Sequence, residues 1–330
     1  MVNITFKQLE AVYEVARSGT VVKAADVLCV TPAALTSRIK LLEDDLGLAL
    51  FDRTGNRLRP TDAGREAMAA AARIDRVILD LADTLNAMKG LHAGCVRFGA
   101  VSTAKYFAAE LIAAFLREHA GVDLKLTIGN RAEMIEALRD YDIDIGLTGR
   151  PPGDFPIESE PFGPHPLVII AAADHPLARR KLVTKAELAN HRFLLREEGS
   201  GTRNVFDYFF AGIEARQPKE TIEMGSNETI KQAVMAGLGL SLISAHTTAS
   251  EVAAKRLAIL RVEGLPIMRQ WFVVRRSNRE LPPAARALWT FISTKGRSFL
   301  PHCGVPNNAV RENHGAKGET RTPTVRPARS

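Results

Sequence analysis

The segment from Thr31 to Asp45, TPAALTSRIKLLEDD, constrains the fold of this chain more than any other stretch. Thr31 can cap a helix that has Pro32 at its first position, where the missing N–H leaves no backbone hydrogen bond unmade. Large apolar residues recur at intervals of four, three and four, which predicts one buried stripe. These residues are Leu35, Ile39, Leu42 and Leu46.

The opposite face of this predicted helix carries small, hydroxylated or basic side chains: Ala33, Thr36, Ser37 and Lys40. Side chains without bulk but with hydrogen-bonding tips suit a helix that lies in a DNA major groove. Two shorter amphipathic patterns precede it, over Phe6–Ser18 and after Thr20, and Cys29-Val30 makes a tight turn. This order predicts a helix-turn-helix unit. The alternative is an ordinary three-helix bundle that does not bind DNA.

Residues 48–61, LALFDRTGNRLRPT, place turn-forming residues between two short extended pieces, which predicts a hairpin or wing. Thr54-Gly55-Asn56 forms the turn, and Arg53, Arg57 and Arg59 cluster around it. A guanidinium beside a tight turn can reach phosphates or the minor groove. We therefore predict DNA contact by the wing, with a solvated loop as the alternative.

A long helix is predicted next, capped by Thr61 and stopped by Gly90 after about Lys89. Arginines and aspartates such as Arg76 and Asp80 favour a helix that is exposed on its other faces. Apolar residues at heptad spacing indicate a coiled-coil partner helix, and they are Ala67, Ala71, Ile74, Ile78, Leu81, Leu85 and Met88. We predict that this helix dimerises and presents two DNA-reading helices to two half-sites. The alternative is a stripe that packs on its own domain.

Strands and helices alternate after residue 94, which predicts a parallel sheet flanked by helices. Pro161–Pro166 is expected to separate this unit from a second α/β unit that begins at Leu167–Ala173, and Leu265-Pro266 is expected to return the chain to the first. Two lobes joined by two crossings leave a cleft where strand ends and helix N-termini meet. The other predicted strands are Val96–Val101, Leu124–Ile128, Ile143–Thr148, Phe193–Leu195, Thr221–Met224, Leu240–Ile243 and Arg269–Arg275.

Polar residues stand at several helix openings around this predicted cleft. Helix N-termini offer free N–H groups and positive potential, and added Arg and Lys make phosphate or carboxylate the natural guest. The predicted effector-binding residues are Ser102, Thr103, Lys105, Asn130, Arg150, Ser200, Gly201, Thr202, Arg203, Ser226 and Asn227. These residue types by themselves predict only that the ligand is a small anion. The alternative is that each hydroxyl caps its own helix.

Charge and composition limit the class of protein without deciding it. The net charge is +7, yet residues 1–90 hold 12 basic and 12 acidic residues, so DNA binding is inferred from local placement rather than from bulk charge. No apolar run of membrane-spanning length and no secretory leader is recognisable, so a cytoplasmic protein without a membrane partner is expected. Cys29, Cys95 and Cys303 form no CxxC pair, which argues against a zinc site and fits a reducing compartment. Residues 300–330 are expected to be a disordered basic tail.

The segment FKQLEAVYEVARSGTVVKAADVLCVTPAALTSRIKLLEDDLGLALFDRTGNRLRPTDAGRE resembles the N-terminal winged helix-turn-helix of LysR-type transcriptional regulators. The long helix and the two lobes are similar to the same family, so the resemblance covers about residues 3–295. It implies an α + α/β fold: a winged helix-turn-helix domain (1–61), a linker or dimerisation helix (62–90) and a periplasmic-binding-protein-like effector domain (91–299). Lobe I would comprise about 91–162 and 267–299, and lobe II about 163–266.

Motifs in the effector domain, among them GNRAEMIEALRD, FLLREEGSGTR and MGSNETIKQAVMAGLGL, resemble the CbbR branch of that family, which controls the RuBisCO operon and other Calvin cycle genes. This implies an activator that binds double-stranded DNA, pairs into a homodimer or homotetramer, contacts RNA polymerase and needs no cofactor or metal. Its effector would be a phosphorylated metabolite or NADPH. The resemblance, the small-residue face and the wing together give the candidate DNA-binding residues Thr31, Pro32, Ala33, Ala34, Thr36, Ser37, Arg38, Lys40, Arg53 and Arg57.

Two other classes of protein fit the chain less well. An enzyme is disfavoured because no nucleophile–base–acid set, GxGxxG or GxxxxGK[ST] motif is present. A periplasmic solute-binding protein is disfavoured by the helix-turn-helix and by the lack of a leader. A LysR-type regulator of another metabolic operon remains the nearest alternative.

Overall fold

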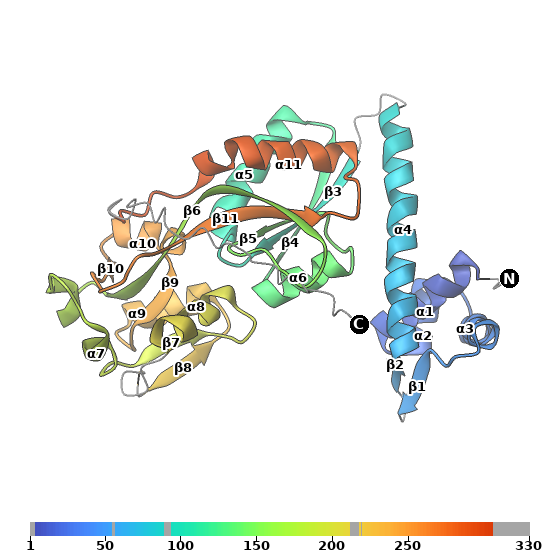
Figure 1. The fold of residues 1–330 in the computed structure, drawn as a ribbon, viewed down its shortest axis with the longest axis horizontal. Helices are drawn as coiled ribbons and strands as arrows, with labels where there is room; N and C mark the ends of the chain where they lie inside the picture. The colour runs from blue at the N-terminus through green and yellow to red at the C-terminus, as the bar shows by residue number, and fades with distance from the viewer. Residues whose placement is uncertain (1–3, 55–56, 89–93, 212–217, 219, 306–330) are drawn as a thin grey trace, which may run out of the picture.

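The computed structural model describes residues 4–54, 57–88, 94–211, 218 and 220–305. It has an N-terminal helical head, one long helix and a two-lobed α/β region, as the sequence predicted (Figure 1). No helix within these ranges is both long and apolar enough to cross a membrane.

The head begins with three helices, α1 (Phe6–Ser18), α2 (Val21–Val27) and α3 (Pro32–Leu46). The predicted cap of α3 is confirmed, since the hydroxyl of Thr31 accepts a hydrogen bond of 3.2 Å from the backbone N–H of Ala34. Three members of the predicted stripe of α3 are buried and Leu46 is partly buried, so the three helices share one apolar core.

The predicted wing is a two-stranded antiparallel hairpin of β1 (Phe51–Thr54) and β2 (Arg57–Pro60). Gly55 and Asn56, which were predicted to form its turn, lie outside the described residues. The carboxylate of Glu43, on α3, accepts a hydrogen bond of 2.7 Å from the backbone N–H of Leu50 and so connects α3 to the start of the wing.

Helix α4 (Asp62–Met88) follows the wing and is capped by the hydroxyl of Thr61, which accepts from the backbone N–H of Gly64 at 3.0 Å. The predicted stop at Gly90 lies outside the described residues. The predicted heptad stripe divides into two parts. Ala67 and Ala71 pack into the core of the head, which corrects their assignment to a dimer seam.

The other faces of α4 are not wholly exposed, in contrast to the prediction. Arg76 is 3% exposed, and its guanidinium lies 2.9 Å from Asp144 and 3.0 Å from Asp80. Arg279 completes the cluster, with contacts of 2.9 Å to Asp144 and 2.7 Å to Asp80. Four charges therefore fasten α4 to the first lobe of its own chain.

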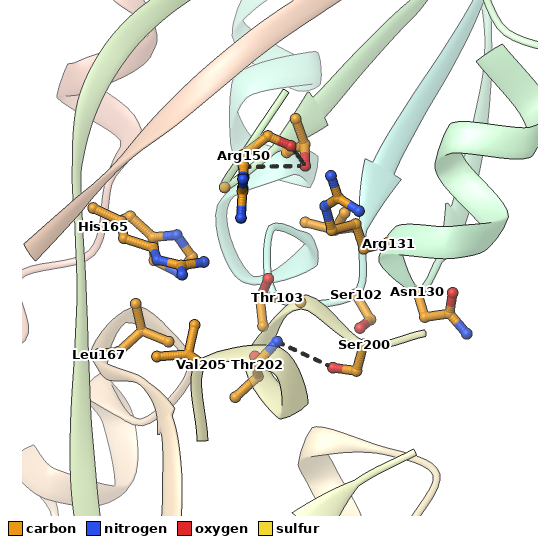
Figure 2. Close-up of a pocket in the computed structure, with 15 residues that line it drawn as sticks. Ser102, Thr103, Asn130, Arg131, Arg150, His165, Leu167, Ser200, Thr202 and Val205 are labelled. Atoms are coloured by element: carbon orange, nitrogen blue, oxygen red, sulfur yellow. Dashed lines mark hydrogen bonds between the residues drawn. The ribbon is translucent and has the colours of Figure 1, made fainter. Parts of the chain in front are cut away.

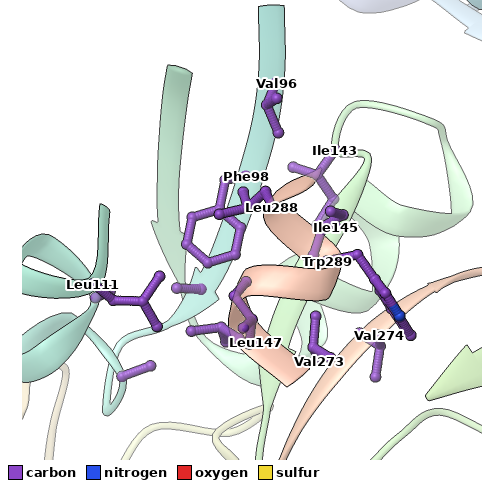
Figure 3. Packing of buried hydrophobic residues seen from close by; sticks show 14 of the residues in the cluster. Val96, Phe98, Leu111, Ile143, Ile145, Leu147, Val273, Val274, Leu288 and Trp289 are labelled. Carbon is purple, nitrogen blue, oxygen red and sulfur yellow. The ribbon is translucent and has the colours of Figure 1, made fainter. Parts of the chain in front are cut away.

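Lobe I has the predicted parallel order, in which β3 (Gly94–Val101) pairs with β4 (Val122–Gly129) on one side and with β5 (Ile145–Thr148) on the other. The sheet is mixed rather than purely parallel, because β11 (Ile267–Arg276) runs antiparallel to β5 and also pairs with β6 (Ile157–Ala172). Figure 3 shows side chains from the strands packing against α11, with Phe98 and Leu288 in the centre of this core.

At Pro161–Pro166 the chain passes from the core of lobe I, which contains Phe162, to the core of lobe II, which contains Leu167. The prolines do not interrupt the strand, because β6 runs from Ile157 to Ala172. It pairs with β11 along ten positions, and these two long strands form the two crossings between the lobes (Figure 1). Proline is tolerated there because, among the described strands, this part of β6 pairs with β11 alone, and its other edge is paired only from Leu167 onwards.

The remaining predicted strands are found within two residues of their expected bounds.

The strands of lobe II are β9 and β10, which pair with the outer end of β6, and a second, parallel pair formed by β7 and β8. The segments of the two lobes are β3 (Gly94–Val101), α5 (Lys105–Glu118), β4 (Val122–Gly129), α6 (Arg131–Arg139), β5 (Ile145–Thr148), β6 (Ile157–Ala172), η1 (Pro176–Arg179), α7 (Lys185–Leu188), β7 (Phe193–Arg196), α8 (Gly201–Phe210), β8 (Thr221–Met224), α9 (Asn227–Met235), β9 (Ser241–Ser244), η3 (Ala245–Thr247), α10 (Ala249–Ala253), β10 (Leu257–Ile259), β11 (Ile267–Arg276), α11 (Pro283–Lys295) and η4 (Gly296–Phe299).

The beginning of the predicted tail is part of the fold. Leu300 packs on the core of lobe I, and Cys303 and Val305 pack on a core cluster of lobe II. The rest of the predicted tail, residues 306–330, lies outside the described residues.

Candidate functional site

The first candidate site is the outer face of α3. Most of the residues predicted to contact DNA are exposed there, namely Thr31, Pro32, Ala33, Ala34, Thr36, Ser37 and Lys40, and Arg38 is half-buried. The hydroxyl of Thr36 donates to the backbone carbonyl of Pro32 at 2.9 Å, so its remaining capacity is to accept. The face therefore carries small, hydroxylated and basic side chains and is free to enter a groove.

Arg53 and Arg57 lie on the two strands of the wing, one on β1 and the other on β2. Arg53 pairs with Leu58, and Arg57 pairs with Thr54 at the last register position before the turn. The backbone thus carries both arginines to the tip of the hairpin, next to α3 in the chain.

A second candidate surface is the free half of the α4 stripe. Ile74, Ile78, Leu81 and Leu85 are between 39% and 57% exposed, and Val77 beside them is 65% exposed. Exposed leucine and isoleucine at heptad spacing indicate a surface that is covered by another helix. Met88, the last member of the predicted stripe, ends the described part of α4.

The third candidate site is a cavity between the lobes, where the ends of β3 and β5 meet the start of α8 (Figure 2). Its volume is about 30 Å³ when measured for the centre of a water-sized sphere, and all the atom-free space, with the solvent at its mouth, is about 430 Å³. Seven of the predicted effector-binding residues line it: Ser102, Thr103, Asn130, Arg150, Ser200, Gly201 and Thr202. Lobe I supplies the first four and lobe II the last three, so a ligand here would touch both.

Three arginines give the cavity its charge. Arg131, Arg150 and Arg269 all line it, and none of its lining residues is acidic. Burial lowers the pKa of Arg131 below its ordinary value, and the neighbouring Arg150 lowers it further. Burial likewise lowers the pKa of Arg269, with added effects from Arg150 and Arg131. Three confined positive charges that disfavour one another make an anion the complementary ligand.

One amide and one hydroxyl of the cavity wall are already used as helix caps. The side-chain oxygen of Asn130 accepts from Glu133 N at 3.0 Å, and the hydroxyl of Ser200 accepts from Thr202 N at 3.3 Å. The capping alternative is therefore also true for these two residues. Only the remaining donors of the wall, above all the arginines, are left for a ligand.

Three predicted residues, Lys105, Ser226 and Asn227, lie in a neighbouring cleft on the other side of Ser102. The ammonium of Lys105 lies 2.8 Å from the carboxylate of Glu228, across the two lobes. The buried Arg196 donates to Asn227 at 2.7 Å and to Ser102 at 3.1 Å. The pairs Lys105–Glu228 and Arg196–Ser102 join the two lobes, and Lys105, Ser226 and Asn227 do not line the anion cavity.

Arg203 is excluded from the cavity, which corrects its prediction as an effector ligand. Its guanidinium lies 3.2 Å from the carboxylates of both Asp207 and Glu223. It also donates to the backbone carbonyl of Arg196. The arginine at the end of the GSGTR segment therefore braces α8 against β8.

Sequence reasoning missed two important residues of the cavity, His165 and Arg269. They lie 104 residues apart in the chain but are register partners, since β6 pairs with β11 there. Arg131 also lines the cavity, although it is not among the predicted effector-binding residues. Within the described residues, no group of three His, Cys, Asp or Glu side chains is placed to hold a metal ion.

A winged helix-turn-helix head, a long helix with an exposed apolar stripe and a two-lobed domain with an anion cavity define a ligand-responsive DNA-binding regulator. Comparison with known families agrees. Residues 6–65 match the bacterial regulatory helix-turn-helix protein, lysR family, and residues 89–297 match the LysR substrate binding domain. The chain therefore belongs to the LysR family.

Individual relatives are similar over nearly the whole chain. The HTH-type transcriptional regulator CbbR of Rhizobium meliloti (strain 1021) is 47% identical over 306 residues, which cover 93% of this chain and 98% of the relative. The RuBisCO operon transcriptional regulator of Allochromatium vinosum is 37% identical over 301 residues, 91% of this chain and 99% of that one. These relatives are named as regulators and not as enzymes, in agreement with the sequence prediction.

Among solved structures, the regulatory domain of Synechocystis PCC6803 CcmR in complex with 2-PG is 32% identical, with a TM-score of 0.58. The match covers 61% of this chain and 96% of that domain.

Proposed function

We propose that this chain is a cytoplasmic transcriptional activator of the RuBisCO operon and other Calvin cycle genes, and that a small anionic metabolite controls it. The similarity to CbbR and to the RuBisCO operon regulator over more than nine tenths of the chain supports the choice of operon. The single structural observation that carries the ligand class is the cavity with three arginines and no acidic lining residue. A regulator of another metabolic operon is the second candidate.

The DNA contact is assigned to the exposed face of α3, with Lys40 at its middle, and to the arginines of the wing. Phosphate contacts by Lys and Arg supply much of the affinity, and short polar side chains in the groove supply the selection of bases. The exposed half of the α4 stripe, from Ile74 to Leu85, is assigned to pairing with a second copy. Two such dimers forming a tetramer, and contact with RNA polymerase, belong to the same proposal.

Control of DNA binding by the ligand requires a physical link from the cavity to α4. Three strands supply it. β3 and β5 each end at the cavity, and β11 begins there with Arg269. At their other ends, Asp144 precedes β5, Arg279 follows β11, and the backbone N–H of Arg97 on β3 donates to Asp144 at 2.9 Å.

The link reaches α4 through Arg76 and Asp80, which pair with Asp144 and Arg279. Closing the lobes on an anion would thus shift a rigid sheet to which α4 is fastened, and the two DNA-binding heads of a dimer would change their spacing. The domain limits 1–61, 62–90 and 91–299 are proposed as the moving bodies, with lobe I (91–162 and 267–299) bearing α4 and lobe II (163–266) closing on it.

The DNA assignment is tested by Lys40→Glu, with Lys125→Glu as a control of equal charge change on an exposed edge strand of lobe I. Binding to the promoter fragment beside the chain's own gene is measured by fluorescence anisotropy. Lys40→Glu should weaken binding at least about tenfold, while Lys125→Glu should bind as the wild type does. Equal binding by all three proteins would contradict the assignment.

The ligand class is tested by calorimetry with ribulose bisphosphate, phosphoenolpyruvate, NADPH and 2-PG. Arg269→Gln should lose most of the affinity for whichever anion binds, and Arg203→Gln should keep it because Arg203 is held outside the cavity by Asp207 and Glu223. An anion that binds the Arg269 variant as tightly as the wild type would place the site elsewhere.

A further inference from the structure

We propose that His165 recognises a hydroxyl group on the effector, next to its anionic group, so that the cavity selects hydroxylated anions over the same anions without the hydroxyl. This inference rests on the proposed function of the cavity and names the chemical class of its ligand more closely.

The ring of His165 is held in one position. The side chain is 6% exposed and stacks on Trp271, with ring centroids 3.9 Å apart and an angle of 16° between the planes. Trp271 is itself buried, and its indole N–H donates to His246 at 3.0 Å. The ring also needs glycine at position 149, because a Cβ there would lie 2.7 Å from the Nδ1 atom of His165.

This fixed ring points into the cavity with unused hydrogen-bonding capacity. Figure 2 shows it directed from β6 towards the side of the cavity that holds Thr103 and Arg150. Neither Nδ1 nor Nε2 has a hydrogen-bond partner among the described residues. A buried polar atom without a partner is costly, so a polar ring kept in this state at a ligand cavity indicates that the ligand supplies the partner.

The imidazole is neutral at ordinary pH. Burial lowers the pKa of His165 well below 6.5, and His246 and Arg269 lower it further. The charged groups that line the same cavity are Arg131, Arg150 and Arg269, all positive, and none of the lining residues is acidic. A neutral imidazole has one N–H donor and one nitrogen that only accepts.

The acceptor nitrogen is what sets the ligand class. The arginine side chains are donors only, and a carboxylate or fully ionised phosphate is an acceptor only, so a plain anion satisfies the arginines and leaves this nitrogen unpaired. A hydroxyl beside the anionic group donates to it. Sites built around such a group reject analogues that lack the hydroxyl, because the buried partner is then left unpaired.

The test uses a pair of ligands that differ in one hydroxyl. Calorimetry of the full chain at pH 8 compares 3-phosphoglycerate, 3-phosphonooxypropanoate, which lacks the hydroxyl, and inorganic phosphate. The wild type should bind the hydroxylated ester at least about tenfold more tightly than the other ester. His165→Phe, which retains a flat ring on Trp271, should abolish this ratio, and His165→Gln, which offers both a donor and an acceptor, should restore part of it. His191→Phe, outside the cavity, should keep the wild-type ratio.

The wild type decides the matter even where a variant fails to fold. If phosphate binds while the two esters bind equally or not at all, the assignment of His165 is overturned and the anion cavity stands. If none of the three binds, the anion cavity and the inference fail together. Titrations in two buffers of different ionisation enthalpy should show equal proton uptake for the wild type and for His165→Phe. Uptake of one further proton by the wild type would mean that His165 becomes a cation and donates twice, which also overturns the inference.

Discussion

Replacing Asp144 by asparagine should destabilise lobe I strongly, because this carboxylate is the centre of the ion cluster that holds α4. Its side chain is fully buried, and it lies 2.9 Å from both Arg76 and Arg279. Asparagine keeps an oxygen for the backbone N–H of Arg97, but it puts an NH2 donor where the charged oxygen contacts Arg76 and Arg279. The change therefore removes the counter-charge and the acceptor of both arginines while the packing volume stays nearly the same.

The magnitude follows from the burial of the partners. The side chain of Arg76 is 4% exposed and that of Arg279 is 12% exposed, so both guanidinium groups lose a counter-charge that water cannot replace. Removing one partner of a buried ion pair costs about 3–5 kcal/mol, and Asp80 retains a share by staying paired with both arginines. We expect a loss near the lower end of that range.

Urea unfolding followed by tryptophan fluorescence measures this loss directly. Trp271 and Trp289 are the two tryptophans of the chain, and both lie in the core of lobe I. The control is Glu118→Gln, which breaks an ion pair with Lys295 on the surface of the same lobe, where both side chains are about half exposed. That variant should lose less than about 1 kcal/mol. An Asp144→Asn variant as stable as the control would refute the structural role of the cluster.

Three further expectations concern the dimer, the cavity and the pH dependence. Ile78→Asp should dissociate the protein into monomers in analytical ultracentrifugation, because it puts a charge into the middle of the exposed stripe, and a variant that stays dimeric at micromolar concentration would disprove the seam. Gly149→Val should weaken anion binding in calorimetry by forcing the ring of His165 to move, and unchanged affinity would show that the ring position is unimportant. Burial lowers the pKa of His246 to about 4, so the unfolded chain takes up its proton first as the pH falls. Stability contributed by His246 is therefore complete above about pH 6.5 and is lost towards pH 4, with a slope of at most about 1.4 kcal/mol per pH unit. His246→Gln, which can still accept from Trp271, should flatten this part of the curve in urea unfolding at pH 5 and 7, and an unchanged slope would assign the effect to other groups.

The helices of the head could be predicted closely from the sequence because their determinants are local. Thr31 and Pro32 mark the start of α3, and a left-handed Gly47 marks its end, all within one stretch of chain. The strands of the lobes were found for the same reason, since each is a short apolar run between turn residues. The continuity of β6 through its prolines was not predicted, because their effect depends on the pairing partner, which local sequence does not reveal.

The site was predicted in part. Residues whose position depends on the local sequence were predicted, and those positioned by long-range strand pairing were not. Ser102, Asn130 and Ser200 were found because they stand at helix starts, whereas Arg269 reaches the cavity only through the register of β11 with β6. Arg203 looked like a ligand from its neighbours in the chain, but Glu223, on a different strand, holds it away. Long-range pairing decides such outcomes, and heptad spacing alone likewise could not show that Ala67 belongs to the head.

The central claim is that an anion held by the cavity arginines changes how the two heads sit on DNA. DNase I footprinting on the promoter fragment, with and without a saturating anion, tests it most directly. The footprint of the wild type should change in length or in its hypersensitive positions when the anion is added, and that of Arg269→Gln should not change. A wild-type footprint that stays the same while calorimetry shows the cavity to be occupied would contradict the claim.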